Sequence, residues 1–360
     1  MRENIYYWKC DSPNSTDAKK RSYFKEKYDR EGLDETVHEA CSRFFGGAVR
    51  SVEPLRVDGN HTAFIVGHED RQYFFRADDG TTYDDYMLTE SALMQLAADA
   101  GVPVPKVYHT DVSQTHCPFR FQIMDYCPEP CLNLYHKEGT LDTAGVAGQL
   151  GRYLRRLHTI QLEGFGFINT ERLSRNGHLQ GLSVSYLDYF YTRLDDHLGY
   201  LRQFNLLPGG DCDEVIRQFR RHGPRLERTQ GVLVHRDMAL WNVLGSSKRI
   251  AAIIDWDDAV SGDPADDLGI LQCFYDEHFM SALMRAYWDG AAPPDEFICR
   301  VWLHTLRNML WKTMLRHSLG YFEKGGDFFL NTPDVRSSLK DHTLHLLQTA
   351  LNKVRSFETP

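Results

Sequence analysis

Along the N-terminal third of the chain, apolar and polar positions follow first a helical period and then the alternation of half-buried strands. Residues 34–45 have helical spacing, with Asp34 as the predicted N-cap. Gly46 and Gly47 predict the end of that helix. A second helical period covers 89–100 and stops at "GVPVP". Around these helices the alternation predicts five strands, the first three as an antiparallel meander, at residues 48–57, 61–69, 71–78, 106–110 and 119–126.

The rest of the chain is predicted to be mainly helical. Two short extended runs interrupt it, one at 231–237 with 241–245 and one at 249–255. Residues 1–33 are polar and weakly periodic, and we interpret them as an N-terminal extension, helical in part over 18–28. The expected domains are thus this extension, a strand-rich lobe over 34–126 and a helical lobe over 127–360. The predicted helices of the last lobe lie at 142–160, 186–204, from 264 onward, 301–319 and 335–354.

Composition narrows the class of protein. The chain has 360 residues, 42% of them hydrophobic and 25% charged, which is typical of a soluble globular protein large enough for two lobes. A net charge of −9 argues against a nucleic-acid partner. We expect no membrane partner and a cytoplasmic location, because the chain has neither a long apolar run nor a secretory leader. The eight cysteines are irregularly spaced, which predicts free thiols rather than a disulfide framework. Cys127 and Cys131 have no second pair of ligands nearby in the sequence, so we expect no zinc site there.

The stretch "LVHRDMALWNVL" places polar side chains between two short apolar strands. Asp237 and Asn242 should project from this loop in the same direction, and Asp255 ends the next apolar run, "IAAIID". Phosphoryl transfer needs a group that accepts the proton of the incoming hydroxyl and oxygen ligands for magnesium. An aspartate that only caps a turn would explain Asp237 but neither of the other two.

With "IIDWDDAVSGDPADDLG" following "HRDMALWN", residues 34–319 resemble the aminoglycoside phosphotransferase family of kinase-like enzymes. The resemblance implies an α+β, two-lobed protein-kinase-like fold with a small antiparallel-sheet N-lobe and a larger, mainly helical C-lobe. It implies that Asp237 is the catalytic base, that Asn242 and Asp255 hold Mg²⁺, and that ATP or GTP is the phosphoryl donor. His235 and Arg236 would brace the loop.

The same resemblance predicts where the N-lobe contacts the nucleotide. The turn "VDGNHT" would cover the phosphates, although it also suits a plain hairpin. Arg76 stands where kinase-like enzymes commonly have lysine, with Glu90 as its ion-pair partner or as half of a surface pair. Residues 122–127 resemble the hinge that receives adenine, or are an ordinary strand and linker. The predicted nucleotide-binding residues are Gly59, Asn60, His61, Thr62, Arg76, Glu90, Met124, Asp125, Tyr126 and Cys127.

The acceptor is left open between classes. Acids in the helical lobe would suit a cationic amino sugar, although such side chains are usually just solvated. The hypotheses are an aminoglycoside or amino-sugar kinase, a metabolic small-molecule kinase, and a silent nucleotide-binding protein. For Asp263, Asp266 and Asp267 we favour capping of a helix start over support of the loop. The acids are Asp188, Asp195, Asp196, Asp257, Asp258, Asp276, Glu277 and Asp289; Tyr287, Trp288, Trp302 and Trp311 could form a stacking wall but more often fill core.

Overall fold

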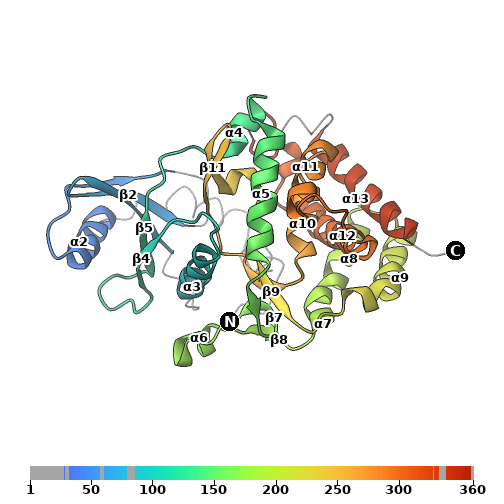
Figure 1. The fold of residues 1–360 in the computed structure, drawn as a ribbon, viewed down its shortest axis with the longest axis horizontal. Helices are drawn as coiled ribbons and strands as arrows, with labels where there is room; N and C mark the ends of the chain where they lie inside the picture. The colour runs from blue at the N-terminus through green and yellow to red at the C-terminus, as the bar shows by residue number, and fades with distance from the viewer. Residues whose placement is uncertain are drawn as a thin grey trace.

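The N-terminal lobe of the computed structural model is a five-stranded antiparallel sheet flanked by two helices (Figure 1). The structure describes residues 28, 32–56, 61–78, 86–326, 328–331 and 338–357. The strand order is β1-β2-β3-β5-β4, so the predicted meander is present and the last two strands form a hairpin beside it. The elements are α2 (Leu33–Phe45), β1 (Ser51–Pro54), β2 (Thr62–His68), β3 (Arg71–Ala77), α3 (Tyr86–Asp99), β4 (Val107–Asp111) and β5 (Phe121–Asp125).

The first helix ends where the sequence predicts. Gly46 has φ 71°, a left-handed conformation that a glycine adopts without strain, and its N–H donates to Ser42 O. The chain can therefore turn back onto the sheet, where Val37 packs with Phe64 and Phe75 in the core of this lobe.

The larger lobe surrounds a long buried helix, α12 (Asp295–Ser318) (Figure 1). A second sheet, in the order β6-β9-β12-β7-β8, and a β10–β11 hairpin connect the helices. The other elements are α4 (Leu132–Lys137), α5 (Thr143–Leu157), β6 (Gln161–Leu162), β7 (Phe165–Ile168), α6 (Thr170–Asn176), β8 (Gly181–Ser183), α7 (Tyr186–Tyr191), α8 (Leu194–Gln203), α9 (Gly209–Leu226), β9 (Gly231–Val234), η1 (Leu240–Asn242), β10 (Val243–Ser246), β11 (Arg249–Ile253), β12 (Val260–Gly262), α10 (Ala265–Gln272), α11 (Glu277–Tyr287), η2 (Tyr321–Glu323) and α13 (Leu339–Ser356).

The helix predicted over 186–204 is wrong as a single element, because it breaks into α7 and α8. Arg193 adopts φ 56° at the break. The buried guanidinium of Arg307 donates to the freed carbonyl oxygens of Phe190 (3.0 Å) and Thr192 (2.6 Å). A side chain from α12 thus satisfies backbone groups that would otherwise be buried without partners.

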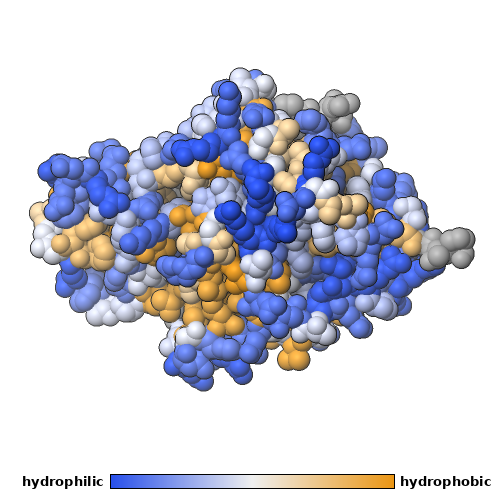
Figure 2. Space-filling view, in the orientation of Figure 1, coloured by the Kyte–Doolittle hydropathy of each residue, from blue (hydrophilic) through white to orange (hydrophobic). Residues whose placement is uncertain are grey.

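The helical stretch predicted over 18–28 lies outside the described residues except for Tyr28. Its hydroxyl donates to Leu55 O at 2.5 Å and accepts from Ala63 N at 3.2 Å. The face in Figure 2 is largely polar over the helical lobe, with apolar side chains gathered beside α3. In the described part of the chain, no helix combines the length and apolar character that crossing a bilayer requires.

Candidate active site

The loop between β9 and β10 brings Asp237 and Asn242 into direct contact. Asn242 Nδ2 donates to Asp237 Oδ2 at 2.7 Å and to Asp237 O at 2.9 Å. Asn242 is buried and Asp237 is partly buried. Because the side-chain nitrogen Nδ2 of Asn242 is bound to Asp237, the side-chain oxygen Oδ1 is left for another partner. No described residue donates to this oxygen, so it can serve as a metal ligand.

Two aspartates at the start of α10 fix the conformation of this loop. Asp267 accepts from the backbone N–H groups of His235 (3.0 Å) and Arg236 (2.7 Å). Asp266 Oδ2 accepts from Arg236 Nε at 3.0 Å. Arg236 has φ 65°, a strained conformation for a residue with a side chain, and these bonds hold it there.

The predicted helix-capping role is therefore wrong for Asp266 and Asp267, whose side chains contact the loop instead. It is right for Asp263, which accepts from Ala265 N at 3.0 Å. The bracing expected of Arg236 is seen in its contact with Asp266.

Asp255 follows β11 and is positioned by backbone contacts with the same loop. Ile254 N donates to Asn242 O at 2.9 Å, and His235 Nε2 lies 3.1 Å from Ile254 O. The His235 ring also packs on Trp256, with centroids 4.6 Å apart. Asp255 has φ 65° and keeps an exposed side chain. The three residues predicted for catalysis and metal binding are thus anchored to one another.

Carboxylates accumulate around this point. Loss of solvent raises the pKa of Asp237 well above its usual range; Lys312 opposes the shift, and Asp258 and Asp255 add to it. Loss of solvent and repulsion by the charge of Asp257 raise the pKa of Asp255, whereas the charge of Arg76 lowers it. Such a surplus of negative charge favours a bound cation.

The oxygen donors at this site suit a magnesium ion that takes only part of its ligands from the protein. No group of three or more His, Cys, Asp or Glu side chains suited to a metal occurs among the described residues. Asn242 Oδ1 and the exposed Asp255 carboxylate supply one amide and one carboxylate oxygen. Mg²⁺ commonly uses such a pair and completes its shell with water and substrate phosphates.

The ion pair predicted between Arg76 and Glu90 is present and buried, so it is not a surface pair. Arg76 Nη2 lies 2.5 Å from Glu90 Oε2. Gln122, predicted only as part of the hinge, is a second partner, and its Oε1 accepts from Arg76 Nε (3.1 Å) and Nη2 (2.6 Å). Burial opposes the charge on Arg76, but Glu90, Asp255 and Asp257 together raise its pKa. Arg76 therefore carries a fixed positive charge toward the carboxylates of the larger lobe.

The predicted phosphate-covering turn is described only in part. Gly59 and Asn60 lie outside the described residues. His61 Nε2 lies 3.5 Å from Asp257 Oδ2, which connects the turn to the larger lobe. Thr62 is buried and begins β2, paired with Ala77.

The predicted hinge, residues 122–127, begins within β5 and continues two residues beyond the end of that strand at Asp125. Met124 and Asp125 still pair with β3 and β4, and the Asp125 carboxylate accepts from Tyr108 Oη at 2.8 Å. The N–H groups of Tyr126 and Cys127 donate no hydrogen bond within the described residues. These two amides are therefore available to a ligand.

Most of the acids considered for acceptor recognition lie away from Asp237. Asp276 caps α11 by accepting from Phe279 N, and Asp289 pairs with Arg155 at the surface. Of these acids, Asp257 and Asp258 are the ones whose charges raise the pKa of Asp237 or Asp255. The other acids are exposed at helix starts: Asp188, Asp195, Asp196 and Glu277. Of the four aromatics, Tyr287 and Trp311 are buried, Trp288 and Trp302 are partly buried, and all four pack in the cores.

Comparison with known proteins agrees with this geometry. Residues 51–300 match the model of the phosphotransferase enzyme family. A mouse (Mus musculus) protein, acyl-CoA dehydrogenase family member 10, is 24% identical over 187 residues, which are 50% of this chain and only 16% of that protein.

Solved structures show the same fold at low identity. Aminoglycoside phosphotransferase APH(4)-Ia, in a ternary complex with ADP and hygromycin B, has a TM-score of 0.63 and 17% identity, covering 90% of this chain and 100% of its own. A choline/ethanolamine kinase family protein from Mesorhizobium loti has a TM-score of 0.55 and 20% identity, covering 90% and 96%. A GDP complex of aminoglycoside 2'-phosphotransferase-IIIa has a TM-score of 0.57 and 18% identity, covering 89% and 97%. The predicted two-lobed α+β fold is confirmed.

Proposed function

Because the chain belongs to the phosphotransferase enzyme family, we propose that it transfers the γ-phosphoryl group of ATP or GTP to a hydroxyl of a small molecule, with Asp237 as the base. The observation that carries the proposal is the contact between Asn242 and Asp237, with the Asn242 backbone bound to the strand end that presents Asp255. A scaffold without activity would not need this alignment of three oxygen-bearing side chains.

The reaction assigns one task to each group. Asp237 accepts the proton of the acceptor hydroxyl as that oxygen bonds to the γ-phosphorus, and the bond to the β-phosphate oxygen breaks to release the nucleoside diphosphate. Mg²⁺, held by Asn242 and Asp255, would neutralise charge on the phosphates. Asn242 keeps the Asp237 carboxylate oriented through its amide.

The nucleotide would lie between the lobes. Arg76, fixed by Glu90 and Gln122, supplies a guanidinium that can bind phosphate oxygens. The free N–H groups of Tyr126 and Cys127 supply backbone donors for a base. Relatives bound to ADP and to GDP support either purine nucleotide as the donor.

Two acceptor classes follow from the relatives. The hygromycin B complex supports an amino sugar, which stays a prediction for this chain. The choline/ethanolamine kinase family relative supports a metabolic kinase. One observation favours the metabolic class. The cation Lys312 of α12 acts on Asp237, and most candidate acids lie at exposed helix starts, which favours a metabolic acceptor without positive charge over an amino sugar or a choline-like amine.

Replacing Asp237 with asparagine tests the base assignment. Asp237→Asn keeps an oxygen for the contact with Asn242 but cannot take a proton at neutral pH. We expect it to fold and bind Mg-nucleotide while turnover falls about 10²- to 10⁴-fold. The assay measures radiolabelled phosphate transferred to a library of hydroxylated amines, acids, sugars and nucleosides. Turnover close to that of the unsubstituted protein would remove Asp237 from the reaction.

A further inference from the structure

One face of α12 carries a row of five polar side chains at intervals of four residues. Residues four apart on a helix lie on the same side, so the row forms a continuous stripe. All five are buried, although arginine and lysine rarely are unless they are paired. The row consists of Arg300, His304, Asn308, Lys312 and Arg316.

The first three members have partners on or just before α10. Arg300 Nε lies 2.8 Å from Asp263 Oδ2. His304 lies between Asp263 and Asp266, at 3.6 and 3.4 Å. Asn308 Nδ2 donates to Asp266 Oδ1 at 2.9 Å. This part of the row supports the catalytic loop through the α10 aspartates.

The last two members form no salt bridge with a carboxylate of the described residues, although the charge of Asp237 acts on Lys312. Lys312 Nζ lies over the rings of Phe274 (4.5 Å) and Trp311 (4.7 Å), and it makes no hydrogen bond or ion pair there. Arg316 Nη1 donates to the neutral hydroxyl of Thr343 at 2.7 Å. Lys312 is 7% exposed and Arg316 is 3% exposed.

Such charges are destabilising without a counterion. Burial lowers the pKa of Lys312 to about 8 and that of Arg316 to about 10, which leaves both mainly protonated at neutral pH. Cys273 does not compensate, because burial raises the pKa of its thiol to about 12. Among the described residues, these two buried cations share the single carboxylate of Asp237, and such an excess of positive charge is suited to receive an anion.

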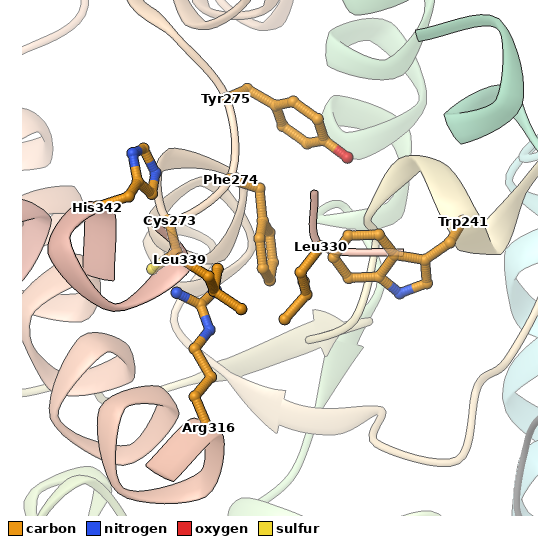
Figure 3. A pocket seen from close by; sticks show the side chains of 8 residues that line it. All are labelled: Trp241, Cys273, Phe274, Tyr275, Arg316, Leu330, Leu339 and His342. Carbon is orange, nitrogen blue, oxygen red and sulfur yellow. The ribbon is translucent and has the colours of Figure 1, made fainter. Parts of the chain in front are cut away.

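Arg316 borders a pocket next to the loop that carries Asp237 (Figure 3), and Lys312 lies over the ring of Phe274, which also lines that pocket. Arg316 and Trp241 lie on opposite sides of it with Phe274 between them. Trp241 belongs to η1, within the same loop as Asp237, and Phe274 is the ring under both cations. The pocket therefore connects the cations to the loop of the proposed base.

We propose that the acceptor carries an anionic group, a carboxylate or a phosphate, which Lys312 and Arg316 bind while its hydroxyl faces Asp237. This inference rests on the proposed phosphotransferase function. A polycationic acceptor would be repelled by the same two charges. Trp241 and Phe274 provide an apolar surface for the carbon skeleton between the two polar ends.

The test uses the full chain and four probes on one three-carbon skeleton: glycerate, glycerol 3-phosphate, glycerol and 3-amino-1,2-propanediol. Dissociation constants are measured by calorimetry with and without saturating Mg²⁺ and AMP-PNP. The variants are Lys312→Met and Arg316→Met, which remove charge at similar volume, and Arg316→Lys, which retains it. Lys248→Met is the matched control, because Lys248 is exposed in the turn between β10 and β11.

We expect an anionic probe to bind the unsubstituted protein about tenfold or more tightly than glycerol or the amine. Lys248→Met and Arg316→Lys should keep this preference, and the two other methionine variants should lose it. Comparison of glycerate with glycerol 3-phosphate tells carboxylate from phosphate. Removal of an unpaired buried charge should not lower the melting temperature, so both methionine variants should fold.

Three results would overturn the inference: equal or tighter binding of glycerol or the amine, an anion preference that survives both methionine variants, or equal weakening of all four probes. The last would assign Lys312 to the transferred phosphoryl group. Failure to bind Mg–AMP-PNP would instead contradict the proposed function, and the measurements without nucleotide would still decide whether the two cations bind an anion.

Discussion

The Asp237 side chain combines a contact that orients it with surroundings that raise its pKa. An ordinary aspartate has a pKa of about 3.9 and is a weak base. A carboxylate with a raised pKa accepts a proton more readily, which suits the removal of a hydroxyl proton. The same shift keeps Asp237 protonated, and thus inactive, to a higher pH. Activity should therefore be lost as the pH falls through a value above that of a free aspartate.

Asp258 allows this pH dependence to be tested. Its charge raises the pKa of both Asp237 and Asp255. In Asp258→Asn both pKa values should fall, so the acid limb of kcat/KM should move to lower pH and more activity should persist in acid. The measurement is a pH profile with one acceptor, and Asp70→Asn in an exposed turn is the control. An acid limb that stays in place or moves upward would contradict this account.

The sequence motifs predicted the candidate site residues that lie at characteristic spacings along the chain. Asp237, Asn242 and Asp255 fall within one short segment. Glu90 lies on the helix that follows the strand of Arg76. Lys312, Arg316 and the contact of Gln122 with Arg76 were not predicted, because they depend on packing between distant elements. A lysine within the apolar stretch "NMLWKTML" was a usable sign, since an isolated charge there must be buried or must break the helix.

At the scale of elements, α10 holds the catalytic loop through two backbone N–H groups that share one carboxylate. Asp267→Asn leaves a single acceptor oxygen, so one of these N–H groups loses its partner. We expect a stability loss of about 1–3 kcal/mol and a lower kcat, because the strained Arg236 conformation would relax.

Chemical denaturation and steady-state kinetics measure these two effects. Asp276→Asn is the matched control, since asparagine caps a helix about as well as aspartate. If the two variants behaved alike, the brace formed by Asp267 would be dispensable.

Elements whose pattern is local were predicted well, and those that depend on tertiary partners were not. The five strands and α3 follow alternation and period. The break between α7 and α8 was missed because Arg307, on a distant helix, compensates for it. In the second sheet β9 falls within the extended run predicted at 231–237, whereas β6, β7, β8 and β12 have two to four residues, too few for a period to be visible.

At the scale of the molecule, the lobes meet through opposite charges and through hydrogen bonds, among them the bond from Ile253 N to Pro103 O at 2.8 Å. Arg76 of β3 faces Asp255 and Asp257, and Tyr86 Oη donates to Ala259 O at 2.7 Å. A metal-bound nucleotide placed here would contact both lobes and should stabilise the whole fold. At a concentration one hundred times Kd, such a ligand adds about 2.7 kcal/mol.

Asp255→Asn should abolish this stabilisation. Asparagine tolerates the left-handed backbone at this position, so the fold should be kept. We expect its melting temperature without ligand to be unchanged and the increase with Mg–AMP-PNP to be lost. Differential scanning calorimetry with Mg²⁺ or with EDTA measures the effect. A variant that retains the full increase would show that Asp255 is not a metal ligand.

The row along α12 has a consequence for how such an enzyme could change its substrate. Its first three members support the loop and Lys312 acts on Asp237, whereas Arg316, two turns beyond Asn308, lines the pocket. Substitution at 316 would therefore change the charge preference of the pocket without touching the residues that support the loop. A single rigid helix would then let descendants of one ancestor acquire different acceptors while inheriting the same chemistry.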